Sequence, residues 1–177
     1  MRKLRQKSLP RVKTTATKRQ RIAVFATLAI LIVAIDQITK YWAEANLSSQ
    51  SIQVIGELLQ FRLAYNNAAA FSIGLGATWI LTLISLTAST LLIVYGPRVK
   101  TMSWAVVAGF ALGGAAGNLI DRALKPPQFL NGWVVDFIQI PFNFPIFNLA
   151  DTFLVSGVVL AVILTLRGDE IGGGRAK

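Results

Sequence analysis

Four apolar stretches of about 20 residues constrain this chain more than any other feature of its sequence. They cover about residues 22–43, 78–95, 102–120 and 146–166. A helix needs roughly 20 mostly apolar residues to cross the hydrocarbon core of a bilayer. Because a backbone amide without a partner is costly in lipid, we expect each stretch to form a membrane-spanning α-helix.

The composition agrees with a membrane protein and excludes several kinds of active site. Of the 177 residues 54% are hydrophobic and 15% are charged, whereas about 25% are charged in a typical soluble domain. The chain has no Cys and no His. A disulfide framework, a thiol nucleophile, a Cys or His metal site and a Ser-His-Asp triad are therefore excluded. Hydrolysis would need carboxylates, a Ser-Lys pair or an oxygen-only metal site.

The N-terminus is strongly basic, with nine Lys or Arg and no acid among residues 1–21. Such a run could be a nucleic-acid-binding arm. It could also be a cytoplasmic tail against anionic lipid, which we favour because an apolar span follows directly. A cleavable signal peptide is the other alternative for this region, but Asp36, Gln37 and Lys40 would make a poor cleavage region. We expect a retained helix, the lipid bilayer as a partner and no nucleic acid.

The positions of Lys and Arg predict the orientation in the cytoplasmic membrane. Basic residues are frequent at both termini and in the loop near residues 96–101, whereas the segments 44–77 and 123–145 have only Arg62 and Lys125. Both termini should therefore be cytoplasmic, with the two longer connections outside. Residues 59–65 and 134–138 have strand-like patterns. We expect a basic tail at 1–20, a four-helix domain at 21–168 and a flexible end at 169–177.

Polar residues that could form a site gather at the outer ends of these spans. Such groups are costly near lipid and normally face the interior of a helix bundle. Asp36 and Lys40 are four residues apart and suit an ion pair, which could be structural or could face a substrate. The other members of this group are Asn118, Asp121, Arg122, Asp136, Asn148 and Asp151.

The third span combines a packing stripe with polar residues at its end. Gly109, Gly113 and Gly117 recur every four residues, a pattern typical of close helix packing. Asp121 continues this stripe, and with Arg122 it indicates a hydrogen-bonded scaffold more often than a catalytic acid.

Asp136 and Asp151 gain meaning only as a pair. Alone, Asp136 would be an ordinary loop acid, and Asp151 would be an acid in a helix's first turn beside Asn148. In a poorly hydrated cleft, two carboxylates tend to share one proton. One can then activate water while the other protonates the substrate, with no metal and no cofactor. We predict an aspartyl hydrolase.

Five motifs follow one another along the chain. They are Asp36-Gln37-Ile38-Thr39-Lys40, Asn66-Asn67-Ala68-Ala69-Ala70-Phe71, Gly113-Gly114-Ala115-Ala116-Gly117-Asn118-Leu119-Ile120-Asp121-Arg122, Val134-Val135-Asp136-Phe137 and Phe147-Asn148-Leu149-Ala150-Asp151. In this order they resemble lipoprotein signal peptidase, the type II signal peptidase family. The resemblance covers about residues 30–155, and the third and fifth motifs are specific in combination.

The resemblance implies four membrane helices with a small β-sheet platform outside. It implies removal of signal peptides from prolipoproteins, just before a cysteine that carries diacylglyceryl. The family's catalytic aspartates fall on Asp136 and Asp151, and its supporting or substrate-binding residues on Asp36, Lys40, Asn66, Asn118, Asp121, Arg122 and Asn148. Ala68 departs from the family's usual Gly, which would cost about 1 kcal/mol if that position needs a positive φ.

Two other classes of protein share some of these features. A small transporter or channel subunit would also bury acids, but it should line a path with polar groups at midplane. The second and fourth spans offer only Thr82, Ser85 and Ser156 there. A non-catalytic assembly factor is supported only by the glycine stripe. We expect a monomeric protease.

Overall fold

The computed structural model describes residues 16–67 and 78–173. Within these ranges it has four helices that are long and apolar enough to cross a membrane. They are α1 (Lys18–Asn46), α2 (Thr78–Tyr95), α3 (Met102–Leu124) and α4 (Leu149–Leu166), with a short 3-10 helix η2 (Gly96–Arg98) between α2 and α3. The four expected spans are confirmed, and the bounds of α2 agree with the prediction.

Two helix starts differ from the prediction because of local capping. Thr17 and Gln20 form a capping box, in which the Gln20 amide donates to Thr17 Oγ1 at 3.2 Å. Residues 18–20, which we expected in the tail, are therefore helical. The fourth helix begins three residues later than expected because Asn148 caps it and accepts a bond from the Asp151 amide at 2.9 Å. An N-cap side chain satisfies a helix amide that has no partner within the helix.

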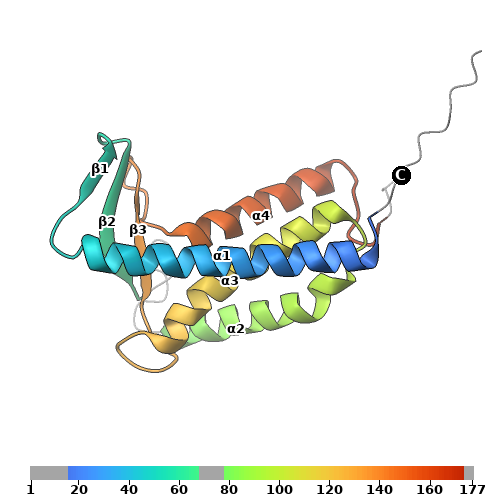
Figure 1. Cartoon of the computed structure of the whole chain (residues 1–177), viewed down its shortest axis with the longest axis horizontal. Helices are drawn as coiled ribbons and strands as arrows, with labels where there is room; N and C mark the ends of the chain where they lie inside the picture. The colour runs from blue at the N-terminus through green and yellow to red at the C-terminus, as the bar shows by residue number, and fades with distance from the viewer. Residues whose placement is uncertain (1–15, 68–77, 174–177) are drawn as a thin grey trace, which may run out of the picture.

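Helix α3 contacts each of the other three helices, and its glycines allow the closest approach (Figure 1). A Cβ on Gly113 would lie 2.6 Å from Ile32 Cβ, and one on Gly117 would lie 2.7 Å from Asp36 Oδ2. No real Cβ tolerates such distances, so the predicted packing role of the stripe is confirmed. Because these glycines have no side chain, α1 and α3 can approach closely at the level of the polar residues.

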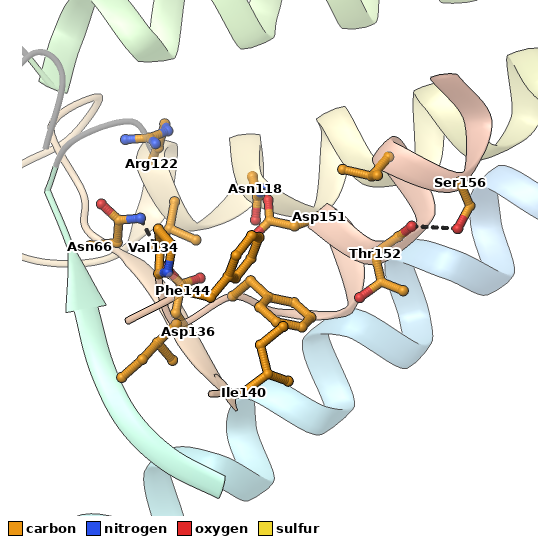
Figure 2. Close-up of a pocket in the computed structure, with 14 residues that line it drawn as sticks. Asn66, Asn118, Arg122, Val134, Asp136, Ile140, Phe144, Asp151, Thr152 and Ser156 are labelled. Atoms are coloured by element: carbon orange, nitrogen blue, oxygen red, sulfur yellow. Dashed lines mark hydrogen bonds between the residues drawn. The ribbon is translucent and has the colours of Figure 1, made fainter. Parts of the chain in front are cut away.

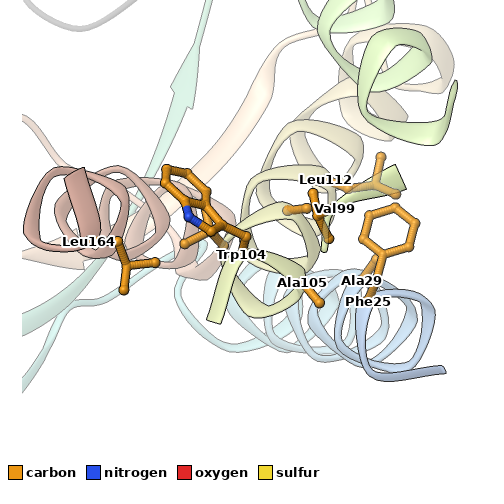
Figure 3. Close-up of a cluster of buried hydrophobic side chains, with 9 residues drawn as sticks. Phe25, Ala29, Val99, Trp104, Ala105, Leu112 and Leu164 are labelled. Carbon is orange, nitrogen blue, oxygen red and sulfur yellow. The ribbon is translucent and has the colours of Figure 1, made fainter. Parts of the chain in front are cut away.

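The larger cluster of buried apolar side chains joins α1, α3, α4 and the residue after η2, and a smaller one lies where α1 meets the sheet. The larger cluster includes Phe25, Ala29, Val99, Trp104, Ala105, Leu112 and Leu164 (Figure 3). The outer faces of the helices remain apolar. Large apolar side chains elsewhere point outward, such as Ile84 on α2 and Val155 on α4, which are 59% and 61% exposed. An apolar surface of this extent suits helices surrounded by lipid.

A three-stranded antiparallel sheet stands across the other end of the bundle, far from η2 and from the start of α1 (Figure 1). Its strands, in spatial order, are β1 (Ile52–Ile55), β2 (Leu59–Asn66) and β3 (Val134–Gln139). The predicted strands β2 and β3 are confirmed, whereas β1 was missed. Phe61 packs edge-to-face against both Trp42 of α1 and Phe137 of β3, which fixes the sheet on the helix bundle.

The segment after α4 is folded onto the start of α3, so residues 169–171 of the expected flexible end are hydrogen-bonded to the rest of the fold. The Trp104 indole donates to the Asp169 carbonyl at 3.1 Å, and the Lys100 amide donates to the Ile171 carbonyl at 3.2 Å. Residues 174–177, Ala68 and most of the basic tail lie outside the described residues.

Candidate active site

A pocket of about 540 Å³ opens where the sheet meets α3 and α4. Five of the polar residues singled out from the sequence line it, although they come from β2, α3, β3 and α4 (Figure 2). The rest of its wall is largely apolar and includes Ile140, Phe144 and Val155. The five polar residues are Asn66, Asn118, Arg122, Asp136 and Asp151.

Asp136, in the middle of β3, is 2% exposed and is held by two side-chain amides. Its Oδ1 accepts from Asn148 Nδ2 at 2.6 Å, and its Oδ2 accepts from Asn66 Nδ2 at 2.9 Å. Burial, together with the charge of Asp151, raises the pKa of Asp136 to about 7, although the two amide bonds oppose the rise. This carboxyl group therefore exchanges its proton near neutral pH.

Asp151 occupies a different environment in the first turn of α4. Its Oδ1 accepts from Asn118 Nδ2 at 2.7 Å, and its Oδ2 accepts from the Asn148 amide at 3.3 Å. The helix N-terminus adds a favourable interaction with a negative charge. Because Asn148 bonds to both Asp136 and Asp151, it fixes the two carboxyl groups relative to each other.

Asn118 and Asn148 connect the pocket to a buried ion cluster. Asn118 Oδ1 accepts from Asn148 Nδ2 at 3.1 Å and from Lys40 Nζ at 2.9 Å. Because the ammonium group can only donate, it sets the orientation of the Asn118 amide. The amide nitrogen of Asn118 is thereby directed toward Asp151.

The ion cluster consists of Asp36, Lys40 and Asp121, each 0% exposed and none of them lining the pocket. Lys40 Nζ lies 2.7 Å from Asp36 Oδ2 and 3.0 Å from Asp121 Oδ2. With Asn118, these carboxylates use the three donors of the ammonium group. Of the two alternatives for Asp36 and Lys40, the geometry favours the structural pair, and it favours a scaffold for Asp121.

The two carboxylates of this cluster also hold the backbone just before each pocket aspartate. Asp36 Oδ1 accepts from the Ala150 amide at 2.9 Å, one residue before Asp151. Asp121 Oδ2 accepts from the Val135 amide at 3.1 Å, one residue before Asp136. A rigid support of this kind is what a site needs if its reacting groups are to keep their positions.

Three pocket or cluster residues were missed as site members at the sequence level. Gln37 Nε2 lies 3.2 Å from Asp36 Oδ2 and 3.1 Å from Asp121 Oδ1, so it bridges the two acids. Its position directly after Asp36 was the available signal. Thr152 and Ser156 line the pocket, and the signal for them was that they are four residues apart, with Thr152 directly after Asp151.

Arg122 completes the polar wall. It is 7% exposed, lines the pocket and attracts both Asp136 and Asp151 electrostatically. Among residues 16–67 and 78–173, no group of three or more carboxylates is arranged to hold a metal ion.

Comparisons with known proteins point to one family. The family model described as signal peptidase (SPase) II matches residues 28–167. A lipoprotein signal peptidase of Leifsonia xyli subsp. xyli is 43% identical over 88% of this chain and 73% of its own length. One from Bifidobacterium longum subsp. infantis is 45% identical over 85% and 82%.

A solved structure supports the same assignment. It is a bacterial membrane enzyme determined by the in meso method at 2.3 Å resolution, with a TM-score of 0.74 and 32% identity. The match covers 82% of this chain and 88% of that one. With four membrane-spanning helices and a family model that matches most of its length, this chain belongs to the signal peptidase II family and is a multi-pass membrane protease.

Proposed function

We propose that this protease removes signal peptides from prolipoproteins by aspartic catalysis, with Asp136 and Asp151 as the dyad. The family match and the names of the relatives support the prolipoprotein substrate and give no support to a transporter. One observation carries the catalytic assignment. Two carboxyl groups from β3 and α4 line the same pocket and are bridged by Asn148.

The different environments of the two carboxyl groups suggest their roles. Asp136, with a pKa near 7, starts with the shared proton. Asp151 removes a proton from water as the water oxygen attacks the scissile carbonyl carbon, and Asp136 protonates the carbonyl oxygen. Asp151 then protonates the leaving nitrogen as the C–N bond breaks, and Asp136 recovers its proton from the intermediate's hydroxyl group.

The distribution of basic residues supports an orientation for the reaction. At the end of the bundle opposite the sheet, α1 starts, η2 lies and α4 ends (Figure 1). Lys18, Arg19, Arg98, Lys100 and Arg167 lie in these segments or within two residues of them. By the positive-inside rule, this end is cytoplasmic and the pocket is near the outer face. The substrate's signal helix enters from the bilayer, and cleavage occurs just before the lipidated cysteine.

A processing assay on a purified, diacylglyceryl-modified precursor tests the dyad. Asp136→Asn and Asp151→Asn keep nearly the same volume but remove proton transfer, so each should lower the rate about 10²- to 10⁴-fold. Asp169→Asn, at the opposite end of the chain's fold, serves as the matched control and should process normally. Full processing by either dyad variant would refute the assignment.

A further inference from the structure

Two hydroxyl groups on α4 line the pocket but take no part in the network around the aspartates. Thr152 and Ser156 are both exposed, and they lie one turn apart on the same face of α4, with Thr152 directly after Asp151 (Figure 2). Thr152 Oγ1 donates to the Asn148 carbonyl at 2.9 Å, and Ser156 Oγ donates to the Thr152 carbonyl at 2.7 Å. Because each hydroxyl hydrogen is already used by the helix, the two oxygens offer only lone pairs to a bound molecule.

The spacing of these acceptors suits an extended peptide. Residues four apart in a helix are displaced by about 6 Å along the axis. In an extended chain, the N–H groups along one edge belong to alternate residues, which are about 6.6 Å apart. A helical peptide offers no such donors, because its interior N–H groups are bonded to its own carbonyl groups.

The apolar wall around Thr152 and Ser156 means that the N–H groups of an unwound peptide need hydrogen-bond acceptors there. Val155 lies between the two hydroxyl residues in sequence, and Phe144 and Ile146 line the same pocket. A signal helix has to unwind near the scissile bond before water can reach that bond. Each N–H group released by unwinding would cost several kcal/mol if it had no partner in such apolar surroundings.

We propose that Thr152 and Ser156 accept hydrogen bonds from two alternate backbone N–H groups of the signal peptide, on the N-terminal side of the scissile bond. The bonds hold this segment extended along α4, with Thr152 nearest to the dyad and Ser156 one turn farther from it. The pair are positioning residues, and the inference rests on the proposed function. It also gives a rule of specificity: a proline, which has no N–H group, is disfavoured at either position.

The test combines enzyme variants with substrates that lack single N–H groups. Lipidated precursor peptides are made with one ester in place of one amide, at successive positions before the cleavage site. With the wild type, esters at two alternate positions should each raise KM about 3- to 10-fold. Ser156→Ala and Thr152→Val should each raise KM for the parent peptide similarly, while kcat changes little.

The decisive measurement is whether the increase in KM caused by an enzyme substitution adds to the increase caused by a substrate ester. In Ser156→Ala, the ester at the matching position should cause no further loss, and Thr152→Val should behave likewise at the other position. Thr90→Val is the matched control, since Thr90 is an exposed hydroxyl on α2 that donates to its own helix at 2.8 Å, outside the pocket. It should leave every ester effect unchanged.

Two outcomes separate the failure of this inference from the failure of the proposed function. Full ester effects in both α4 variants, or wild-type KM values in both, would overturn the inference while Asp136→Asn remains inactive. Processing by Asp136→Asn would instead overturn the aspartic mechanism on which the inference depends.

Discussion

The pocket and the ion cluster both contain buried carboxyl groups, but the partners of these groups differ. In the ion cluster, the Lys40 ammonium group has three acceptors and the acids Asp36 and Asp121 share one cation. In the pocket, Asp136 is also buried, and the side-chain amides of Asn66 and Asn148 donate to its two oxygens. Paired charges make a rigid support, whereas burial and the nearby charge of Asp151 let the Asp136 carboxyl group keep its proton up to about neutral pH.

This difference suggests that the ion cluster and the pocket have separate roles. The cluster acts on the pocket through the backbone, since Asp36 and Asp121 bond to the amides of Ala150 and Val135. Each of these amides directly precedes an aspartate of the proposed dyad. The charged cluster should therefore control stability, and the pocket should control the chemistry.

The largest expected effect comes from breaking the cluster at its cation. Lys40→Met keeps most of the side-chain volume but leaves Asp36 and Asp121 buried without their shared cation. Removal of one partner from a buried ion pair typically costs about 3–5 kcal/mol, so the free energy of unfolding in detergent should fall by that amount.

Lys125→Met is the matched control for this change. Lys125 Nζ lies 2.6 Å from Glu44 Oε2, but both side chains are more than 20% exposed. Its loss should cost only about 0–1 kcal/mol. Equal unfolding midpoints for the two variants would contradict a supporting role for the cluster.

The next effect is a gain of stability when a pocket carboxyl group is replaced, whereas Lys40→Met loses stability. Asp136 has a pKa of about 7 in the folded chain and near 3.8 when unfolded. Between these values the folded state binds more protons, so the free energy of unfolding falls as pH rises through this range. At about 1.4 kcal/mol per pH unit, the fall is at most about 4 kcal/mol.

Asp136→Asn should remove this fall. Thermal unfolding of both proteins in detergent, at about pH 5 and about pH 8, measures it. The variant should gain stability relative to the wild type at the higher pH, although one of Asn66 and Asn148 loses an acceptor oxygen. A variant that loses as much stability as the wild type between the two pH values would show that Asp136 is not the titrating group.

The sequence predicted the helices and strands better than the contacts between them. It predicted the bounds of α2, and the strand patterns located β2 and β3. The four residues of β1 carried too short a pattern to be noticed. The contact of Asp36 with the Ala150 amide joins residues 114 positions apart. Helical periodicity gives the face of a residue but not its depth against a neighbouring helix, so such a partner could not be predicted.

The smallest expected effect is a shift in the pH dependence of kcat/KM when the side-chain amide of Asn66 is removed. If Asp136 must be protonated for catalysis, wild-type processing should decline as pH rises above about 7. The Asn66 amide bond lowers the pKa of Asp136, so Asn66→Ala should raise it. A hydrogen bond of about 1 kcal/mol corresponds to roughly 0.7 pH unit. The pH profile of kcat/KM should therefore keep its shape and move its alkaline limb upward by about that much. Because Lys125 lies outside the pocket wall, Lys125→Met should leave the limb in place. An alkaline limb that stays fixed in Asn66→Ala, or moves downward, would mean that another group supplies the proton.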